Sequence, residues 1–246
     1  MRPGRCTLVL LPGLDGTGQL FDDFIAALGP DIDIIVAAYP LDALLSYTEL
    51  ASVARTFIPA DRPYFLLGES FSGPIAITIA AASPPGLRGM ILCCSFARNP
   101  RPILAWARPL IALFPLMALP LALLSHFLLG RFASPHLRLA LAQTLAKVAP
   151  AVLRQRAVAA LGVDVSQRLS AIAVPLLYLR ASEDRVVPKS ASDEVAAWAP
   201  VTRIVDLVAP HFLLQALPSA AASAVADFMA ALIPAGNTPD PAPKNI

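Results

Sequence analysis

The sequence is poor in the residues that bind metals or crosslink chains. Its 246 residues include three histidines and three cysteines, and Cys6, Cys93 and Cys94 all lie inside apolar runs. These residues form no zinc-binding spacing, so the sequence predicts no zinc site. Cys93 and Cys94 are neighbours in a predicted strand and would point to opposite faces, which disfavours a disulfide between them. Reduced core thiols of this kind favour a cytoplasmic protein.

The chain also has few charged (15%) and few aromatic (7%) residues, and acids are scarce in one segment. Residues 97–170 contain nine basic side chains and one acid, Asp164, a net charge of +8, whereas the rest of the chain carries −6. With few aromatics and no recognised module, this segment does not indicate nucleic-acid binding. An apolar, basic segment suits an anionic membrane surface or an amphiphilic acyl substrate. The alternative is that its arginines only solvate the outer faces of helices.

Apolar residues, by contrast, are abundant at 57%, and they follow alternating strand and helix patterns. Short continuous apolar runs predict buried strands, and longer stretches predict helices. Ser46 and Glu49 have the spacing of a capping box. The alternation predicts an α/β fold with a doubly wound, mostly parallel sheet of about six strands. The expected strands are 6–11, 32–38, 63–67, 88–94, 175–180 and 201–207, and the expected helices are 18–28, 47–58, 72–82, 190–198 and 212–232.

The most informative motif is GESFSG at residues 68–73, between an expected strand and an expected helix. A serine on a sharp strand-to-helix turn has its hydroxyl exposed above the sheet, and small flanking residues let the turn close. The usual pattern is Gly-x-Ser-x-Gly, whereas here Ser72 occupies the fifth position and Gly73 follows it. Because Ser72 is also small, the motif still predicts Ser70 as a nucleophile.

A glycine-rich loop, LPGLDGTG at residues 11–18, follows the first expected strand. A serine that attacks an acyl carbon creates an oxyanion, which requires two aligned backbone N–H donors. We expect these donors to be Leu14, in this loop, and Phe71, directly after the serine. A phosphate-binding loop is the alternative, but the stretch lacks the lysine of a P-loop and the glycine spacing of a dinucleotide fold. Asp15 is expected to form the turn and not to act in catalysis.

A nucleophilic serine needs a general base, and placement favours one histidine. His126 and His136 lie in the basic segment, whereas His211 follows the last expected strand. The order serine, acid, histidine expected of this fold places the base there. The acid should follow the preceding strand, where Asp184 is preferred because the residues after it lead into the next helix. Glu183 is the alternative, and a surface role for both acids is the remaining interpretation.

Together these motifs resemble the α/β-hydrolase superfamily of serine hydrolases, of the carboxylesterase- and lipase-like kind, over nearly the whole chain. LPGLDGTG is similar to the oxyanion loop, GESFSG to the nucleophile elbow, YLRASEDRVVP to the acid loop and APHF to the histidine loop. The opening LPGLDGTG more weakly resembles esterase-like proteins related to plant phytyl-ester synthases. Pro12 stands where many members have a histidine. The resemblance implies a triad of Ser70, His211 and Asp184 that forms an acyl-enzyme, with no cofactor or metal.

The resemblance also suggests the kind of substrate. We expect a small-molecule carboxylic ester, with apolar or medium to long acyl groups favoured. An acyltransferase that uses the same acyl-enzyme with an alcohol acceptor is the close alternative. A non-enzymatic, ligand-binding relative is a third, since this fold hosts many functions.

Residues 109–130 carry no formal charge, and the run is long enough to span a bilayer. Three prolines interrupt it, and a span there would put Ser70 and His211 on opposite sides of the membrane. We therefore expect a helical cap over the site. The first apolar run is too short for a signal peptide, so we expect a cytoplasmic protein that can also contact an anionic membrane peripherally. The expected domains are an α/β-hydrolase core at 1–96 and 171–234, a cap at 97–170 and a flexible tail at 235–246.

Overall fold

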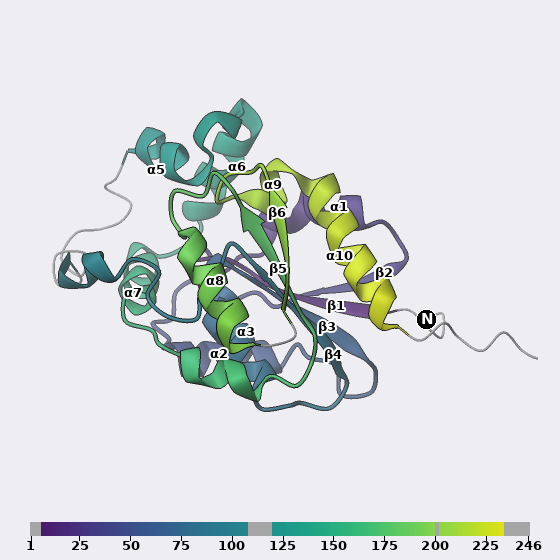
Figure 1. Ribbon diagram of the computed structural model, residues 1–246. Helices are drawn as coiled ribbons and strands as arrows, with labels where there is room; N and C mark the ends of the chain where they lie inside the picture. Colours follow the sequence, from purple (N-terminus) through teal and green to yellow (C-terminus); the bar gives the residue numbers. More distant parts are fainter. Residues whose placement is uncertain (1–5, 108–119, 200–201, 234–246) are drawn as a thin grey trace, which may run out of the picture.

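The computed structural model describes residues 6–107, 120–199 and 202–233. Its centre is one six-stranded sheet in the order β2-β1-β3-β4-β5-β6, and every neighbouring pair of strands is parallel (Figure 1). The doubly wound α/β fold predicted from the sequence is thereby confirmed. The strands are β1 (Cys6–Leu11), β2 (Ile32–Val36), β3 (Tyr64–Glu69), β4 (Leu87–Cys93), β5 (Leu176–Ala181) and β6 (Thr202–Leu207).

Helices cover both faces of this sheet (Figure 1). One face is covered by α1 (Asp22–Leu28) and α10 (Pro218–Leu232), and the other by α2 (Tyr47–Arg55), α3 (Gly73–Ala80) and α8 (Lys189–Trp198). Because successive strand side chains point to opposite faces, β1 contributes to two apolar cores. Leu8 and Leu10 pack beneath α1 and α10, whereas Val9 and Leu11 pack beneath α2 and α3.

The observed strands begin and end within two residues of the predicted ones. The capping box is also confirmed, because the Glu49 N–H donates to Ser46 Oγ (3.3 Å) and the Ser46 N–H donates to the Glu49 carboxylate (2.7 Å). The helix expected at 18–28 instead opens with a 3-10 turn, η1 (Gln19–Phe21), before α1. The helices expected at 47–58 and 72–82 are shorter and end at Arg55 and Ala80.

Two further expectations need correction. The single helix expected at 212–232 is divided into α9 (Leu213–Ala216) and α10, because Pro218 has no N–H to continue the hydrogen-bond ladder. Cys93 and Cys94 do not point to opposite faces, since both contribute to the same apolar core. Cys94 has a φ of 47°, which breaks the strand alternation after β4 ends. All three cysteines are free thiols.

The segment from 97 to 170, called the insert below, is largely helical, and its helices between residues 121 and 145 lie next to the carboxyl ends of the strands (Figure 1). Residues 108–119 and the tail predicted to be flexible lie outside the described residues, so the uncharged run is described only from Pro120 onward. In the described part of the chain, no helix is long and apolar enough to cross a membrane. The insert contains η3 (Pro102–Ala107), α5 (Leu121–Leu128), η5 (Gly130–Phe132), α6 (Pro135–Leu145), α7 (Pro150–Ala160) and η6 (Ser166–Ala171).

The direction of winding changes between β1 and β3. From β1 the chain moves outward to the edge strand β2, and it then returns to place β3 on the other side of β1. Leu11 at the end of β1 pairs with Gly68 near the end of β3. The loop after β1 and the turn after β3 therefore meet at the switch point, where sheets of this kind bind ligands.

Candidate active site

Ser70 occupies the sharp turn between β3 and α3. Its φ of 46° is in the left-handed region, which is uncommon for a residue with a side chain. The turn is held from behind by Ser95, whose Oγ donates to the Ser70 carbonyl at 2.6 Å. Strained backbone of this kind persists where the surrounding structure fixes it, often at functional sites.

Both glycines of the GESFSG motif are required by close packing around this turn. A Cβ at Gly68 would lie 2.9 Å from the Ala76 Cβ and from the Ser72 carbonyl oxygen. A Cβ at Gly73 would overlap the hydroxyl of Ser95. The absence of side chains at these positions lets α3 lie directly behind β3.

Ser72, the residue that departs from the usual motif, connects the turn to its surroundings. Its hydroxyl is fully buried and donates to the Pro12 carbonyl, and it lies 2.7 Å from the Tyr39 hydroxyl. A glycine there could not make these bonds. The departure therefore adds a link between the serine turn and the loop after β1.

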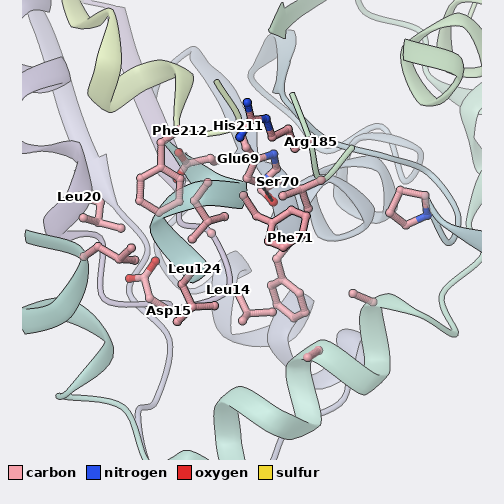
Figure 2. Close-up of a pocket in the computed structure, with 18 of the residues that line it drawn as sticks. Leu14, Asp15, Leu20, Glu69, Ser70, Phe71, Leu124, Arg185, His211 and Phe212 are labelled. Carbon is pink, nitrogen blue, oxygen red and sulfur yellow. Dashed lines mark hydrogen bonds between the residues drawn. The ribbon is translucent and has the colours of Figure 1, made fainter. Parts of the chain in front are cut away.

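The structure brings Ser70, His211 and Asp184 together in one hydrogen-bonded chain. Ser70 Oγ lies 2.8 Å from His211 Nε2, and His211 Nδ1 lies 2.8 Å from Asp184 Oδ2. Figure 2 shows Ser70 and His211 side by side at the cavity. The other Asp184 oxygen accepts the N–H groups of Val186 and Val187, each at 2.8 Å. This geometry can move a proton from a serine hydroxyl to an imidazole whose orientation a carboxylate holds.

The environment of His211 raises its pKa. Burial lowers the pKa, but the charge and hydrogen bond of Asp184, together with the charge of Glu69, outweigh that effect. The net pKa therefore lies above the usual value of 6.5. Stabilisation of the imidazolium favours proton uptake from the serine, provided that the ring starts neutral.

The other candidate residues have different partners. The Glu183 carboxylate accepts hydrogen bonds from Arg131 at the surface, from Nε at 2.9 and 3.0 Å and from Nη2 at 2.5 Å. This pair lowers the pKa of Glu183. His126 Nε2 lies 3.0 Å from the guanidinium of Arg185, and His136 is exposed on α6. The structure thus places Asp184, and not Glu183, against His211.

The loop after β1 forms a tight turn beside the serine. The Gly16 N–H donates to the Gly13 carbonyl at 3.1 Å. Asp15 Oδ2 accepts from the N–H (2.8 Å) and the hydroxyl (2.6 Å) of Thr17, which confirms Asp15 as a turn former.

The two predicted oxyanion donors, Leu14 and Phe71, line the same cavity as Ser70 (Figure 2). Because a trans peptide is planar, the Leu14 N–H points away from the Gly13 carbonyl, which faces into the turn. Among the residues that the structure describes, the Leu14 N–H has no hydrogen-bond acceptor. It is therefore free to bind a ligand.

Sequence reasoning missed Glu69, which it treated as a variable position of the motif. The residue is 6% exposed, and its carboxylate accepts a hydrogen bond from Gln215 Nε2 at 2.8 Å. Burial raises the pKa of Glu69 to about 7, although the Gln215 hydrogen bond opposes the shift. The sequence feature that could have identified Glu69 is an acidic residue at the end of a continuous apolar strand, next to the serine.

Sequence reasoning also missed Arg156, one of the arginines considered for the outer faces of helices. For Arg156 that interpretation is wrong, since the residue is 2% exposed. Its guanidinium donates to the carbonyls of Leu14, Asp15 and Pro40. No periodicity marks it, because α7 has no clear apolar face.

A cavity of about 420 Å³ opens in front of the serine, within the usual size range for small-molecule sites. Ser70 and His211 lie in its wall (Figure 2). Most of the lining is apolar and comes from both the core and the insert: Leu14, Leu20, Phe71, Phe96, Leu124, Phe127, Leu128, Leu141, Leu145, Ala157, Ala160, Leu161, Val186 and Phe212. Such a lining suits a ligand with an extended apolar group.

Within the described residues, three possible metal ligands lie close together at this site. Donor atoms of Cys94, Asp184 and His211 are within 4.8 Å of one another. The facing atoms of Asp184 and His211 are already hydrogen-bonded to each other. Burial raises the pKa of Cys94 well above its usual range, which disfavours the thiolate that binds metals. These donors fit a proton-transfer chain better than a metal centre.

Several solved structures share this fold at low sequence identity. A hydrolase from Oleispira antarctica has a TM-score of 0.79 at 15% identity, over 93% of this chain and 92% of that one. A thermophilic esterase from Thermogutta terrifontis has a TM-score of 0.78 at 17% identity, over 94% and 91%. A lipase-esterase related protein from Clostridium acetobutylicum has a TM-score of 0.75 at 16% identity, over 91% and 94%.

The sequence itself matches a protein family. No curated protein matches the chain significantly. A family model described as serine aminopeptidase, S33, however, matches residues 47–213, about two thirds of the chain. That match includes the serine turn, the acid loop and the histidine loop. The chain therefore belongs to the serine aminopeptidase S33 family, within the α/β-hydrolase superfamily.

Proposed function

We propose that the protein is a serine hydrolase that cleaves carboxylic esters, with apolar medium or long acyl groups favoured. One observation carries the proposal: the hydrogen-bonded chain of Ser70, His211 and Asp184 ends at an apolar cavity of about 420 Å³. A nucleophile activated in this way attacks acyl carbons. The apolar lining supports a substrate whose acyl group leaves water on binding.

The proposed reaction proceeds through an acyl-enzyme. His211 accepts the proton of Ser70 as Oγ bonds to the acyl carbon, and the N–H groups of Leu14 and Phe71 stabilise the resulting oxyanion. His211 then donates that proton to the departing alkoxide as the ester C–O bond breaks. A water molecule, deprotonated by His211, attacks the acyl group, and return of the proton to Ser70 releases the acid. Asp184 orients the imidazole and stabilises its charged form throughout.

The test is hydrolysis of p-nitrophenyl esters from acetate to octanoate. Each methylene that enters the cavity contributes about 0.8 kcal/mol, so kcat/KM should rise up to roughly fourfold per methylene. Ser70→Ala should abolish the hydrolysis. Failure to cleave any ester of the series, or full activity in Ser70→Ala, would show that the proposal is wrong.

Two other reactions, acyl transfer to an alcohol and cleavage of an amide, use the same acyl-enzyme chemistry. A change of acceptor or of substrate in this assay distinguishes them from ester hydrolysis. In an acyltransferase an alcohol replaces water, and the apolar cavity favours this alternative because it limits water near the acyl group. Added glycerol or butanol would then raise p-nitrophenol release and yield a new ester. Because the matching family model is described as a serine aminopeptidase, aminoacyl p-nitroanilides should be assayed as well. Faster cleavage of these amides than of any ester would replace the ester proposal.

We also propose that the insert contacts anionic lipid surfaces. Its sequence has a net charge of +8. Large apolar side chains are exposed on it, among them Ile103, Trp106, Leu121, Leu123, Phe127 and Leu139. Apolar groups with nearby basic residues favour adsorption to an anionic interface. A protein with this property could take its substrate from a membrane or micelle.

A further inference from the structure

We propose that Arg156, on helix α7 of the insert, is a positioning residue that holds the loop after β1 in the geometry needed to bind the oxyanion. The inference rests on the proposed function, because it concerns the same reaction. It makes the insert part of the catalytic framework as well as a cover for the cavity.

The contacts of Arg156 are directed at the backbone of that loop. Nη1 donates to the carbonyl oxygens of Leu14 (2.9 Å) and Asp15 (2.8 Å), and Nη2 donates to that of Pro40 (2.8 Å). One planar guanidinium thus connects the loop after β1, the loop after β2 and helix α7. A lysine ammonium lacks this fixed fork of donors.

These contacts fix the orientation of successive peptide planes. Each carbonyl lies in one plane with the following N–H, so Arg156 sets the planes on both sides of Asp15. The Gly13 carbonyl is fixed separately, because it accepts the Gly16 N–H at 3.1 Å. The plane of the Leu14 N–H, the proposed oxyanion donor, is therefore held from both ends of the turn.

Tyr39 extends the same network toward the serine turn. The Arg156 guanidinium lies 5.6 Å from the centre of the Tyr39 ring. The Tyr39 N–H donates to the Gly16 carbonyl (2.8 Å), and its hydroxyl lies 2.7 Å from Ser72 Oγ. The arginine thus belongs to one connected unit with both proposed oxyanion segments.

Loss of Arg156 would leave buried carbonyl groups without donors. A buried acceptor that loses its partner is destabilising, so the loop should rearrange to reach other donors or water. Displacement of a catalytic group by about 1 Å can cost about a hundredfold in rate. We therefore expect removal of Arg156 to weaken stabilisation of the transition state more than it weakens binding of the substrate in the ground state.

The test compares Arg156→Met and Arg156→Lys with Arg154→Met, a matched control on the same helix. We expect kcat for p-nitrophenyl butyrate to fall about 10- to 100-fold in Arg156→Met and less in Arg156→Lys, with KM within about threefold of the wild type. Affinity for a boronic acid, whose adduct with Ser70 is tetrahedral and anionic, should fall in parallel with kcat/KM. Affinity for a neutral alcohol inhibitor should stay unchanged.

The outcomes separate this inference from the function on which it rests. A wild-type protein that cleaves no ester contradicts the proposed function. An active wild type with kcat retained in Arg156→Met, or with equal losses in Arg154→Met, contradicts the role of Arg156. If Arg156→Met does not fold, as judged by circular dichroism, Arg156→Lys carries the test. In that case, an Arg156→Lys variant whose kcat and boronate affinity equal those of the wild type would overturn the inference.

Discussion

At the scale of single residues, the adjacent acids Glu183 and Asp184 have different partners. Asp184 binds His211 in the interior, whereas Glu183 pairs with Arg131 at the surface. We expect Asp184→Asn to lower kcat by about 10⁴-fold, because the imidazole loses the acceptor that fixes its tautomer. Glu183→Gln, the matched control, should leave kcat within about twofold. Steady-state assays on a p-nitrophenyl ester measure both values, and a larger loss in Glu183→Gln would refute the assignment of the acid.

The pH dependence follows from the protonation of His211. Its pKa is raised above 6.5 in the folded protein, and only the neutral ring can accept the serine proton. Activity should therefore be lost in acid and rise with pH through a midpoint above 6.5. The charge of Glu69 contributes to the raised pKa, so Glu69→Gln should shift the midpoint of kcat/KM downward. A flat profile between pH 5 and 8 would contradict the role of His211.

Residues placed by motif and chain order could be predicted from the sequence, and residues placed by packing could not. Ser70, Asp184 and His211 each follow a strand, so their meeting at one edge of the sheet follows from the fold. Glu69 has a raised pKa because it is buried, and its hydrogen-bond partner Gln215 lies 146 positions away in the sequence. Arg156 reaches Leu14 across 142 positions from a helix without periodicity, and nothing in the local sequence marks that contact.

At the scale of elements, the capping box of α2 offers a test of stability independent of activity. Ser46→Ala removes the acceptor of the Glu49 N–H and the hydroxyl donor to the Glu49 carboxylate, while the backbone N–H donor at position 46 remains. We expect the free energy of unfolding to fall by about 1 kcal/mol, measured by urea denaturation. No residue of α2 lines the cavity, but Tyr47 stacks on Phe71 with 4.7 Å between the ring centroids, so the unfolding free energy and not kcat is the readout. An unaltered unfolding midpoint would show that the cap contributes no net stability.

The strands of the core could be predicted because helices cover both faces of the sheet. Strands in such a sheet have continuous apolar sequences bounded by turn residues. Errors occurred where local backbone chemistry interrupts a pattern, as at Pro218 between α9 and α10 and at the left-handed Cys94 after β4. In the insert, a helical cap was expected at 97–170, but no boundaries were predicted for its individual helices. Its helices are short, and α6 and α7 have no distinct apolar face, so the sequence gives no periodic signal for them.

At the scale of the whole molecule, the basic insert and the acidic core predict oriented binding to membranes. Binding to anionic vesicles should exceed binding to neutral ones and should weaken with added salt, which screens exposed charges. Trp106→Ser should lower the partition coefficient by about tenfold, because it removes a large exposed apolar group. Trp198→Ser, an exposed tryptophan of α8 in the core, is the control and should have little effect. Equal effects of the two variants, measured by vesicle sedimentation, would contradict docking through the insert.

The central claim is that Ser70 is a nucleophile activated by His211, and covalent labelling tests it most directly. The protein is treated with a fluorophosphonate, digested and examined by mass spectrometry. The account predicts one label on the peptide that contains Ser70, none in Ser70→Ala and much slower labelling in His211→Ala. A label on a different residue, or undiminished labelling in Ser70→Ala, would contradict it.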